Sequence, residues 1–223
     1  MSWWLPPAYS TFAGPIDGLF LAILIITGIA LVVVEVGLVV FVVRYRGRPG
    51  RKAHYTHGST RAEIIWTAIP AVTMVALGLV SNHYWVQIKA RRSVPADAMQ
   101  LGVHGKQFEW QMTYPGADGR LGTGDDFTVR NQLHIPVDRP VAVHLSSEDV
   151  IHSFFVPEFR VKQDAVPGMD IVAWFQATRV GEYEIGCAEL CGMGHYQMRA
   201  RVFVHTPEAF AAWMTQQASG GAE

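Results

Sequence analysis

Residues 186–198 read GCAELCGMGHYQM and contain the only two cysteines of the chain, Cys187 and Cys191. His195 and Met198 follow in the same stretch. Two thiols, an imidazole and a thioether are soft donors, and such donors select copper over calcium or magnesium. Zinc prefers Cys and His and gains little from Met. The stretch therefore predicts a copper site in a loop, with a Cys–Cys disulfide in an oxidising compartment as the alternative.

A second imidazole for this site is expected from elsewhere in the chain. Among the nine histidines, His152 is the best candidate, because in SSEDVIHSFFVP it follows a strand and begins a loop. Side chains on neighbouring loops at one end of a β-sandwich can converge on one metal. Three other histidines of the predicted strands are expected to be solvated; they are His134, His144 and His205.

Residues 99–223 consist of short segments of alternating polarity, separated by turns rich in Gly, Pro and Asp. Alternation with period two is typical of strands with one buried face. About seven such strands predict an all-β sandwich or small barrel. PEFRVKQDAVPG (157–168) is expected to connect two strands, and PEAFAAWMTQQA (207–218) to form a short helix before a frayed tail.

The insertion DGRLGTGDD, residues 118–126, carries carboxylates at short spacing. Calcium binds such oxygen donors, but the insertion lacks the spacing and the final glutamate of an EF-hand loop. A solvated hairpin is therefore the preferred interpretation, and calcium binding stays open.

Two apolar runs precede the predicted β-domain, within residues 1–98. The first, LFLAILIITGIALVVVEVGLVVFVV (19–43), is long enough to cross a bilayer as a helix. The second extends from Ile64 to about residue 85 and contains Pro70. We expect a transmembrane hairpin with helices over about residues 17–44 and 63–88.

Charge patterning indicates how this hairpin is oriented. The loop between the helices carries six basic residues, whereas the N-terminal tail has none. The positive-inside rule therefore predicts a cytoplasmic loop, with both termini and the β-domain on the periplasmic side of a bacterial inner membrane or its equivalent. Lys89, Arg91 and Arg92 argue the other way, but they are fewer. Glu35, the only charge of the first run, is expected to pack against a partner subunit or to lie near the interface.

The β-domain has the opposite charge balance. Residues 99–223 carry nine Lys/Arg and fifteen Asp/Glu, whereas residues 1–98 carry nine and four. An acidic domain favours a basic protein partner through electrostatic steering and argues against nucleic-acid binding. The sequence also lacks a C-x-x-C-H motif for covalent haem and a phosphate-binding glycine loop.

Four motifs give the chain a resemblance to subunit II of the haem–copper respiratory oxidases, the cytochrome c oxidase subunit II family. The copper A motif of that family, C-x-E-x-C-x-x-x-H-x-x-M, is matched from Cys187 to Met198. Its upstream ligand motif reads SSEDVIHSF at residues 146–154, and KxDAxPG reads KQDAVPG at residues 162–168. The signature of the second helix reads EIIWTAIPA at residues 63–71.

The resemblance implies a cupredoxin-like domain in which Cys187 and Cys191 bridge two copper ions. It also implies one imidazole per copper, a weak thioether ligand and a backbone carbonyl ligand; these are His152, His195, Met198 and Glu189. The side chain of Glu189 is implied to reach a magnesium ion shared with subunit I. Glu63 matches the glutamate at the mouth of a proton pathway, although alone it reads as a helix N-terminal acid stabilised by the dipole.

The implied function is that of the electron-accepting subunit of a terminal oxidase. Electrons from cytochrome c or a similar donor would pass through copper A to haem in subunit I, where oxygen is reduced to water with proton pumping. A nitric oxide reductase with the same copper domain is the alternative within the superfamily. A membrane-anchored copper-binding or copper-delivery module is the alternative from another class.

One position departs from the family pattern. Where the family has G-x-Q-W-x-W, this chain reads GKQFEWQ, with Phe108 in the place of the first tryptophan and Trp110 two residues later. The electron is therefore expected to arrive at Phe108 or Trp110. Glu148 and Asp149 match family acids near the docking face, and they suit a lysine-ringed cytochrome c.

Overall fold

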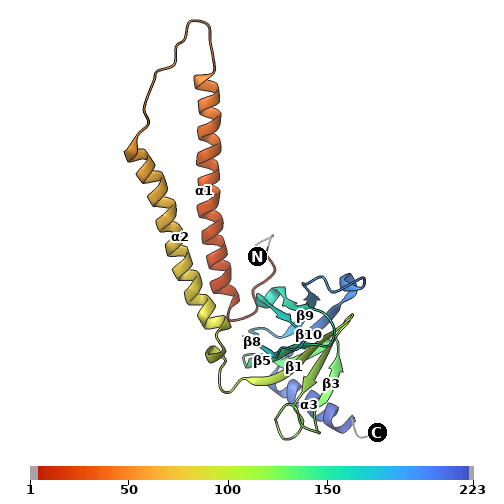
Figure 1. Ribbon diagram of the computed structural model, residues 1–223. Coiled ribbons are helices and arrows are strands. Elements are labelled where there is room, and N and C mark those ends of the chain that lie inside the picture. The colour runs from red at the N-terminus through yellow and green to blue at the C-terminus, as the bar shows by residue number, and fades with distance from the viewer. Residues whose placement is uncertain (1–4, 221–223) are drawn as a thin grey trace. The chain divides into compact units, whose positions relative to one another are not determined.

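The computed structural model describes residues 5–220, which divide into two compact units (Figure 1). One unit is the helical segment Asp17–Trp85, and the other joins the residues up to Ile16 with those from Val86 onward. The frayed tail expected at the C-terminus falls largely on residues 221–223, which lie outside the described range.

Two long helices form the hairpin, α1 (Ala13–Tyr45) and α2 (Thr60–Lys89). Their most apolar windows have mean hydropathies of 2.9 and 2.0, and none of the residues in those windows is buried by other parts of the chain. A helix so apolar and so exposed is stable only where lipid or other protein covers it. Both helices are long enough to span a membrane, which confirms the predicted hairpin.

The second unit is a sandwich of two five-stranded sheets, labelled in part in Figure 1. The first sheet has the order β3 (Phe127–Arg130), β2 (Glu109–Tyr114), β1 (Met99–Lys106), β5 (Pro140–Ser147), β8 (Ile171–Gln176). The second has the order β4 (Gln132–Pro136), β10 (Arg199–His205), β9 (Gly181–Cys187), β6 (His152–Val156), β7 (Val161–Ala165). The sandwich confirms the predicted fold class.

The strands alternate between buried and more exposed residues, as in β1, so each sheet turns one face to a common core. The largest fully buried side chains of this core are Trp110, Tyr114, Phe154, Phe159 and Phe175. The helix α3 (Pro207–Gly220) follows β10. Trp213 of α3 packs edge-on against Tyr114 and at a tilt against Phe127.

Two segments differ from the sequence prediction. The run 127–135 is two strands rather than one, because Asn131 adopts a left-handed backbone conformation (φ 56°) and moves the chain from the first sheet to the second. Within 152–165, which was expected to be mostly loop, β6 and β7 form an antiparallel pair around a short 3₁₀ turn, η2 (Pro157–Phe159). These two strands place His152 inside the second sheet.

His134 was expected to be solvated, and this prediction is wrong. Its side chain is buried, and its ring stacks on Trp213 with centroids 4.1 Å apart and planes 9° apart. Nδ1 of His134 lies 2.8 Å from Nε2 of His205. Burial, followed by the nearby His205 imidazole, lowers the pKa of His134 to about 4, so the ring is neutral at physiological pH.

The first described residues belong to the sandwich. Ser10 forms an isolated antiparallel bridge with Ala177, and its hydroxyl donates to the carbonyl of Phe159 at 2.6 Å. Phe12 is buried and packs edge-on against Trp174, with ring centroids 4.5 Å apart. The sequence predicts only a tail for this segment, because a lone short segment carries no strand periodicity.

The insertion at 118–126 satisfies its carboxylates locally. Asp125 accepts from the backbone N–H of Asp118, and Asp126 accepts from that of Gly122. These carboxylates stabilise the turns of a surface hairpin, which is the interpretation that the sequence favoured.

Candidate metal centre

The two cysteines lie close together without being bonded to each other. Cys187 ends β9 and Cys191 lies in the loop that follows, with their Sγ atoms 3.9 Å apart. A disulfide requires about 2.05 Å. Two thiolates that share a tetrahedral metal at about 2.3 Å each lie about 3.8 Å apart. The observed separation therefore suits two sulfurs that bind the same metal ion.

Each sulfur has an imidazole beside it. His152, the first residue of β6, places Nδ1 3.9 Å from Sγ of Cys187. His195 begins a short 3₁₀ turn, η3 (His195–Gln197), and places Nδ1 3.5 Å from Sγ of Cys191. The donor atoms of His152, Cys187 and Cys191 all lie within 4.8 Å of one another.

Two weaker donors complete the cluster. Sδ of Met198 lies 3.7 Å from Sγ of Cys191, and its side chain is buried. The carbonyl oxygen of Glu189 lies 3.2 Å from Sγ of Cys187, while the Glu189 side chain is exposed. The structure thus brings together all six donors that the sequence singled out, in a set that matches the preferences of copper.

The backbone holds this loop at both ends. The N–H of Cys187 donates to the carbonyl of Met198 at 3.1 Å, and the N–H of Ala188 donates to that of Ser153 at 3.0 Å. The pairing of Phe154 with Cys187 between β6 and β9 fixes His152 next to the loop. Donors from two segments distant in sequence therefore meet on one sheet.

The protein alone does not favour the thiolate form of Cys191. Burial, followed by the neighbouring Cys187, raises the pKa of the Cys191 thiol to about 11. A metal cation stabilises the thiolate and reverses this effect. The cluster therefore has the chemistry of a site that a soft cation completes.

Asp149 orients His152. Its Oδ1 lies 2.8 Å from Nε2 of His152, which is buried, and this contact leaves Nδ1 facing the sulfurs. Burial would raise the pKa of Asp149, but hydrogen bonds from His152 and from the N–H groups of Gln107 and Val150 outweigh it and lower the pKa to about 2. A carboxylate behind a metal-binding histidine fixes the tautomer and the ring.

Gln107 connects Asp149, which holds His152, with the loop that carries Cys191. It lies between β1 and β2, and its backbone N–H donates to Oδ2 of Asp149 at 2.8 Å. Its side-chain amide donates to the carbonyl of Cys191 at 2.5 Å. Sequence reasoning missed the structural role of both residues. An acid three positions before a predicted metal-binding His was a usable signal for Asp149, and Gln107 offered none.

The floor of the site depends on a glycine and a tryptophan. A Cβ atom on Gly105 would lie only 2.9 Å from the ring of His152, so any larger residue there would displace the imidazole. Trp110 packs edge-on against His152, with centroids 5.9 Å apart. Because Trp110 is fully buried, a soluble donor cannot touch it.

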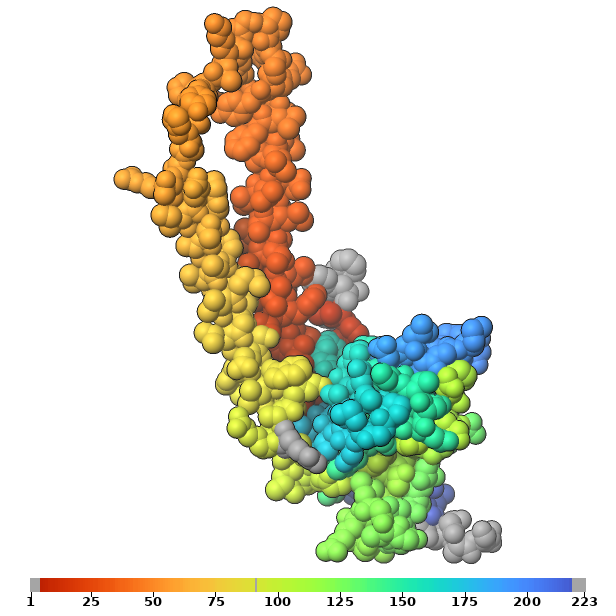
Figure 2. Space-filling view, in the orientation of Figure 1, coloured from red at the N-terminus to blue at the C-terminus, as the bar shows by residue number. Residues whose placement is uncertain are grey.

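Of the two aromatic residues expected at the point of electron entry, only Phe108 is exposed, with 37% of its surface accessible. Its ring lies against Gly192 and Gly194 of the sulfur loop, where a Cβ atom would collide with it. Further exposed apolar side chains lie in the same loop or directly before His152, and together with Phe108 we call them the apolar rim: Phe108, Ile151, Leu190, Met193 and Tyr196. The loop that carries three of them is the blue segment projecting from the β-domain in Figure 2.

The two acids expected at the docking face have local partners. Asp149 is engaged with His152, as described above. Glu148 lies 3.3 Å from Nζ of Lys106 and 3.8 Å from Nε2 of His104, so part of its charge is compensated. Apolar contact is therefore the prominent feature of the surface beside the sulfurs.

The remaining predicted site residues lie in the helical unit. Glu63 is exposed in the first turn of α2, and its N–H donates to the carbonyl of Ser59. Glu35 is exposed within α1. Neither contributes to the metal cluster.

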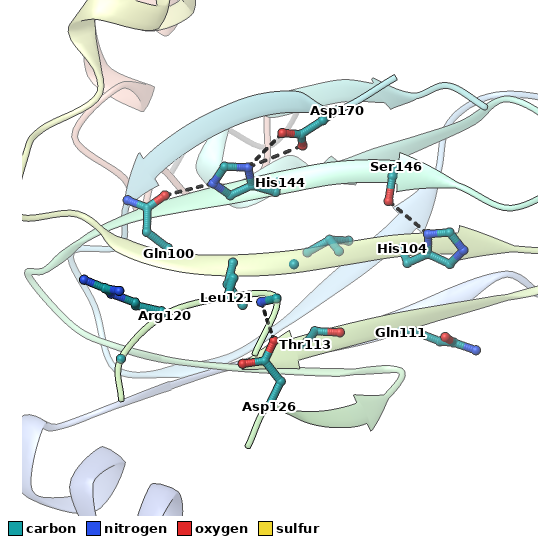
Figure 3. Close-up of a pocket in the computed structure, with 14 residues that line it drawn as sticks. Gln100, His104, Gln111, Thr113, Arg120, Leu121, Asp126, His144, Ser146 and Asp170 are labelled. Atoms are coloured by element: carbon teal, nitrogen blue, oxygen red, sulfur yellow. Dashed lines mark hydrogen bonds and ion pairs between the residues drawn. The ribbon is translucent and has the colours of Figure 1, made fainter. Parts of the chain in front are cut away.

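A separate groove of about 930 Å³ lies on the outer face of the first sheet (Figure 3). His144 lies there between Asp170 and Gln100, and His104 lies 2.9 Å from the hydroxyl of Ser146. Two hydrogen-bonded groups of side chains, His144 with its two partners and His104 with Ser146, thus lie in the groove. His144 keeps 32% of its side chain exposed, so it is in part in contact with solvent, as expected.

The two apolar helices and the sandwich with its six converging donors define a membrane-anchored protein with a cupredoxin-like, copper-binding domain. Comparisons with known proteins identify the family within this class. Residues 106–204 match the family described as "Cytochrome C oxidase subunit II, periplasmic domain", and residues 1–83 match its transmembrane domain.

Individual relatives agree. The chain is 38% identical to the alternative cytochrome c oxidase subunit 2 of Bradyrhizobium diazoefficiens, over 96% of this chain and 84% of that protein. It is 34% identical to cytochrome c oxidase subunit 2 of Thermostichus vulcanus, over 95% of this chain and 78% of that protein. The crystal structure of the periplasmic domain of subunit II of cytochrome oxidase of Bradyrhizobium japonicum superposes with a TM-score of 0.51 at 31% identity, covering 58% of this chain and 99% of that one. The chain belongs to the cytochrome c oxidase subunit II family and is a subunit of an oxidoreductase.

Proposed function

We propose that this chain holds a binuclear copper A centre, accepts electrons there from cytochrome c or a similar donor, and passes them to haem in subunit I. The oxidase would reduce oxygen to water and pump protons. The observation that carries the proposal is the pair of unbonded sulfurs, 3.9 Å apart, each with its own imidazole and its own weak donor.

The protein's part in this function is positioning. When bound, the copper pair supplies a one-electron carrier that makes and breaks no bonds to a substrate. Cys187 and Cys191 would hold the two ions through their sulfurs, together with the imidazoles of His152 and His195. Asp149 holds the ring of His152, and Gln107 holds both Asp149 and the carbonyl of Cys191. A cluster held this firmly changes its geometry little when its charge changes, which favours fast electron transfer.

The donor would dock on the apolar rim. Phe108 is exposed and touches the loop that carries the sulfurs, so we assign the arrival of the electron to Phe108 rather than to the buried Trp110. The acidic balance of residues 99–223 would steer a basic donor over a longer range.

Other residues would serve the assembled oxidase. The exposed side chain of Glu189 would reach a magnesium ion at the border with subunit I, and Glu63, in the first turn of α2, would receive protons. Glu35 would pack against a partner subunit, because a carboxylate in a membrane-spanning helix needs a polar neighbour. The basic loop between the helices would lie in the cytoplasm and the copper domain in the periplasm.

The test is electron transfer in the purified oxidase that contains this subunit. Reduced cytochrome c should be oxidised rapidly with oxygen as the final acceptor, and Phe108→Ala should slow the first electron transfer severalfold while leaving the copper spectrum intact. Phe108→Tyr is the matched control and should stay close to the original rate. Consumption of nitric oxide in place of oxygen would favour the reductase alternative. One readily chelated copper and no turnover would favour a delivery module.

A further inference from the structure

The loop between α1 and α2 carries a concentration of positive charge that copper A chemistry does not use. Six cations lie between residues 44 and 61, and no Asp or Glu occurs from residue 36 to residue 62. Within the described residues, none of the six forms an ion pair with a carboxylate. They are Arg44, Arg46, Arg48, Arg51, Lys52 and Arg61.

Part of this charge lines a recess. After α1 ends at Tyr45 the chain turns back, so that Nη1 of Arg51 donates to the carbonyl of Arg44 at 2.7 Å. The same guanidinium lies 5.6 Å from the centroid of the Tyr45 ring. These contacts cover the last turn of α1 and close one side of the recess.

The recess measures about 630 Å³, which is within the range of small-ligand sites. Besides Arg51, its lining includes Arg46, Arg48, Lys52 and Thr56. Several cations and a hydroxyl donor around one concave space match the chemistry of a phosphate group. Because like charges this close repel one another, the recess gains stability when an anion neutralises it.

The place of the recess identifies the source of the phosphate. The loop joins two helices that are long enough to span a bilayer, and Arg44 and Arg61 lie in the end turns of those helices. Cations next to a membrane-spanning helix lie at the depth of the lipid phosphates, and each contributes about 1 kcal/mol of attraction to an anionic surface.

We propose that residues 45–56 form a binding site for the headgroup of an anionic phospholipid. Arg46, Arg48 and Lys52 contact the phosphate, and Arg51 positions the turn that carries them. The proposal needs only that the hairpin is inserted in a membrane, and it holds whether or not the copper assignment is correct.

The test uses the full chain in nanodiscs, where both membrane faces are accessible and the orientation of insertion does not matter. The nanodiscs contain phosphatidylcholine with a minor fraction of phosphatidylglycerol, and native mass spectrometry measures which lipid stays bound. The original chain should retain phosphatidylglycerol preferentially. In the variant Arg46→Gln/Arg48→Gln/Lys52→Gln this preference should fall by about fivefold for each cation removed.

The matched control, Arg130→Gln/Arg139→Gln/Arg199→Gln, removes the same charge from exposed positions of the sandwich and should keep the preference. Equal helix content by circular dichroism in all three proteins excludes misfolding. An unchanged preference in the loop variant, or an equal loss in the control, would overturn the proposal. Displacement of the lipid by inorganic phosphate at millimolar concentration would also overturn it, since the site would then select a free anion.

Discussion

In the sandwich, every sheet turns one face to a shared core and the metal donors are fixed by hydrogen bonds, whereas α1 and α2 bury almost nothing within the chain. The residues of the sandwich are therefore sufficient to determine how it packs. The helices of the hairpin are apolar and long enough to enter a membrane, but their final packing depends on lipid and partner subunits. The candidate metal centre is thus organised by contacts within the sandwich, several of them remote in sequence, whereas the anchor is completed by the assembly.

Of the changes considered, the replacement Cys191→Ser should have the largest effect, because it should remove the copper centre while leaving the sandwich folded. Because serine cannot bridge copper ions, the shared-electron spectrum should disappear. The sandwich should stay folded, since its core does not depend on the metal. Copper spectroscopy and near-UV circular dichroism of the full chain in detergent measure the two properties. Loss of the folded sandwich together with the spectrum would show that the metal is required for folding.

Phe12→Ala tests where the sandwich begins. Phe12 is buried against Trp174, although it precedes the membrane helix by a single residue. Truncation of a buried Phe costs about 3 kcal/mol. We expect a loss of this size in the free energy of unfolding of the sandwich, measured by denaturant titration with tryptophan fluorescence. A loss below about 0.5 kcal/mol, the range of ordinary surface substitutions, would place the N-terminal segment outside the sandwich.

Asp149→Asn tests how far local contacts organise the metal centre. The amide cannot accept from both His152 and the Gln107 backbone as the carboxylate does. Loss of such a partner typically weakens metal binding by about 10–100-fold, which is the expected change in copper affinity by competition with a chelator. Glu148→Gln, next to it on the surface, is the control and should bind copper as the original chain does. Equal affinity in the Asp149 variant would contradict the positioning role.

Mild acidification should have the smallest effect, a modest loss in the stability of the sandwich against unfolding. The folded-state pKa of His134 is about 4, below the ordinary value of 6.5, so the unfolded chain binds a proton more readily. Stability should therefore fall as the pH decreases from 6.5 towards 4. The denaturation midpoint of the sandwich at pH 5 and at pH 7 measures this, with His134→Gln as the control that loses part of the dependence. A higher midpoint at pH 5 would contradict the buried neutral imidazole.

Sequence patterns were sufficient for the parts of the molecule that depend on local chemistry. Hydropathy predicted the hairpin, because lipid imposes one requirement on every residue of a spanning helix. The spacing from Cys187 to Met198 predicted four donors, because they lie in one loop. His152 was singled out because it was expected to follow a strand and begin a loop, whereas the structure makes it the first residue of β6.

Patterns failed where contacts distant in sequence decide the outcome. The strand pair β6 and β7 is short, and its residues read as loop in the sequence, although β6 pairs with both β7 and β9 in the structure. His134 reads as a polar strand residue, yet Trp213 of α3 covers it. Gln107 supports the metal loop through a contact with Cys191, which is remote in sequence. Such pairings follow from the tertiary fold and leave no periodic signal.

The central claim is that two sulfurs and two imidazoles hold a pair of copper ions as one electron carrier. Electron paramagnetic resonance of the copper-loaded full chain, with metal content measured on the same sample, tests it most directly. The account predicts two coppers per chain and the multiline hyperfine pattern of one unpaired electron shared by two equivalent copper nuclei. A single copper per chain, with the hyperfine pattern of one nucleus, would contradict it.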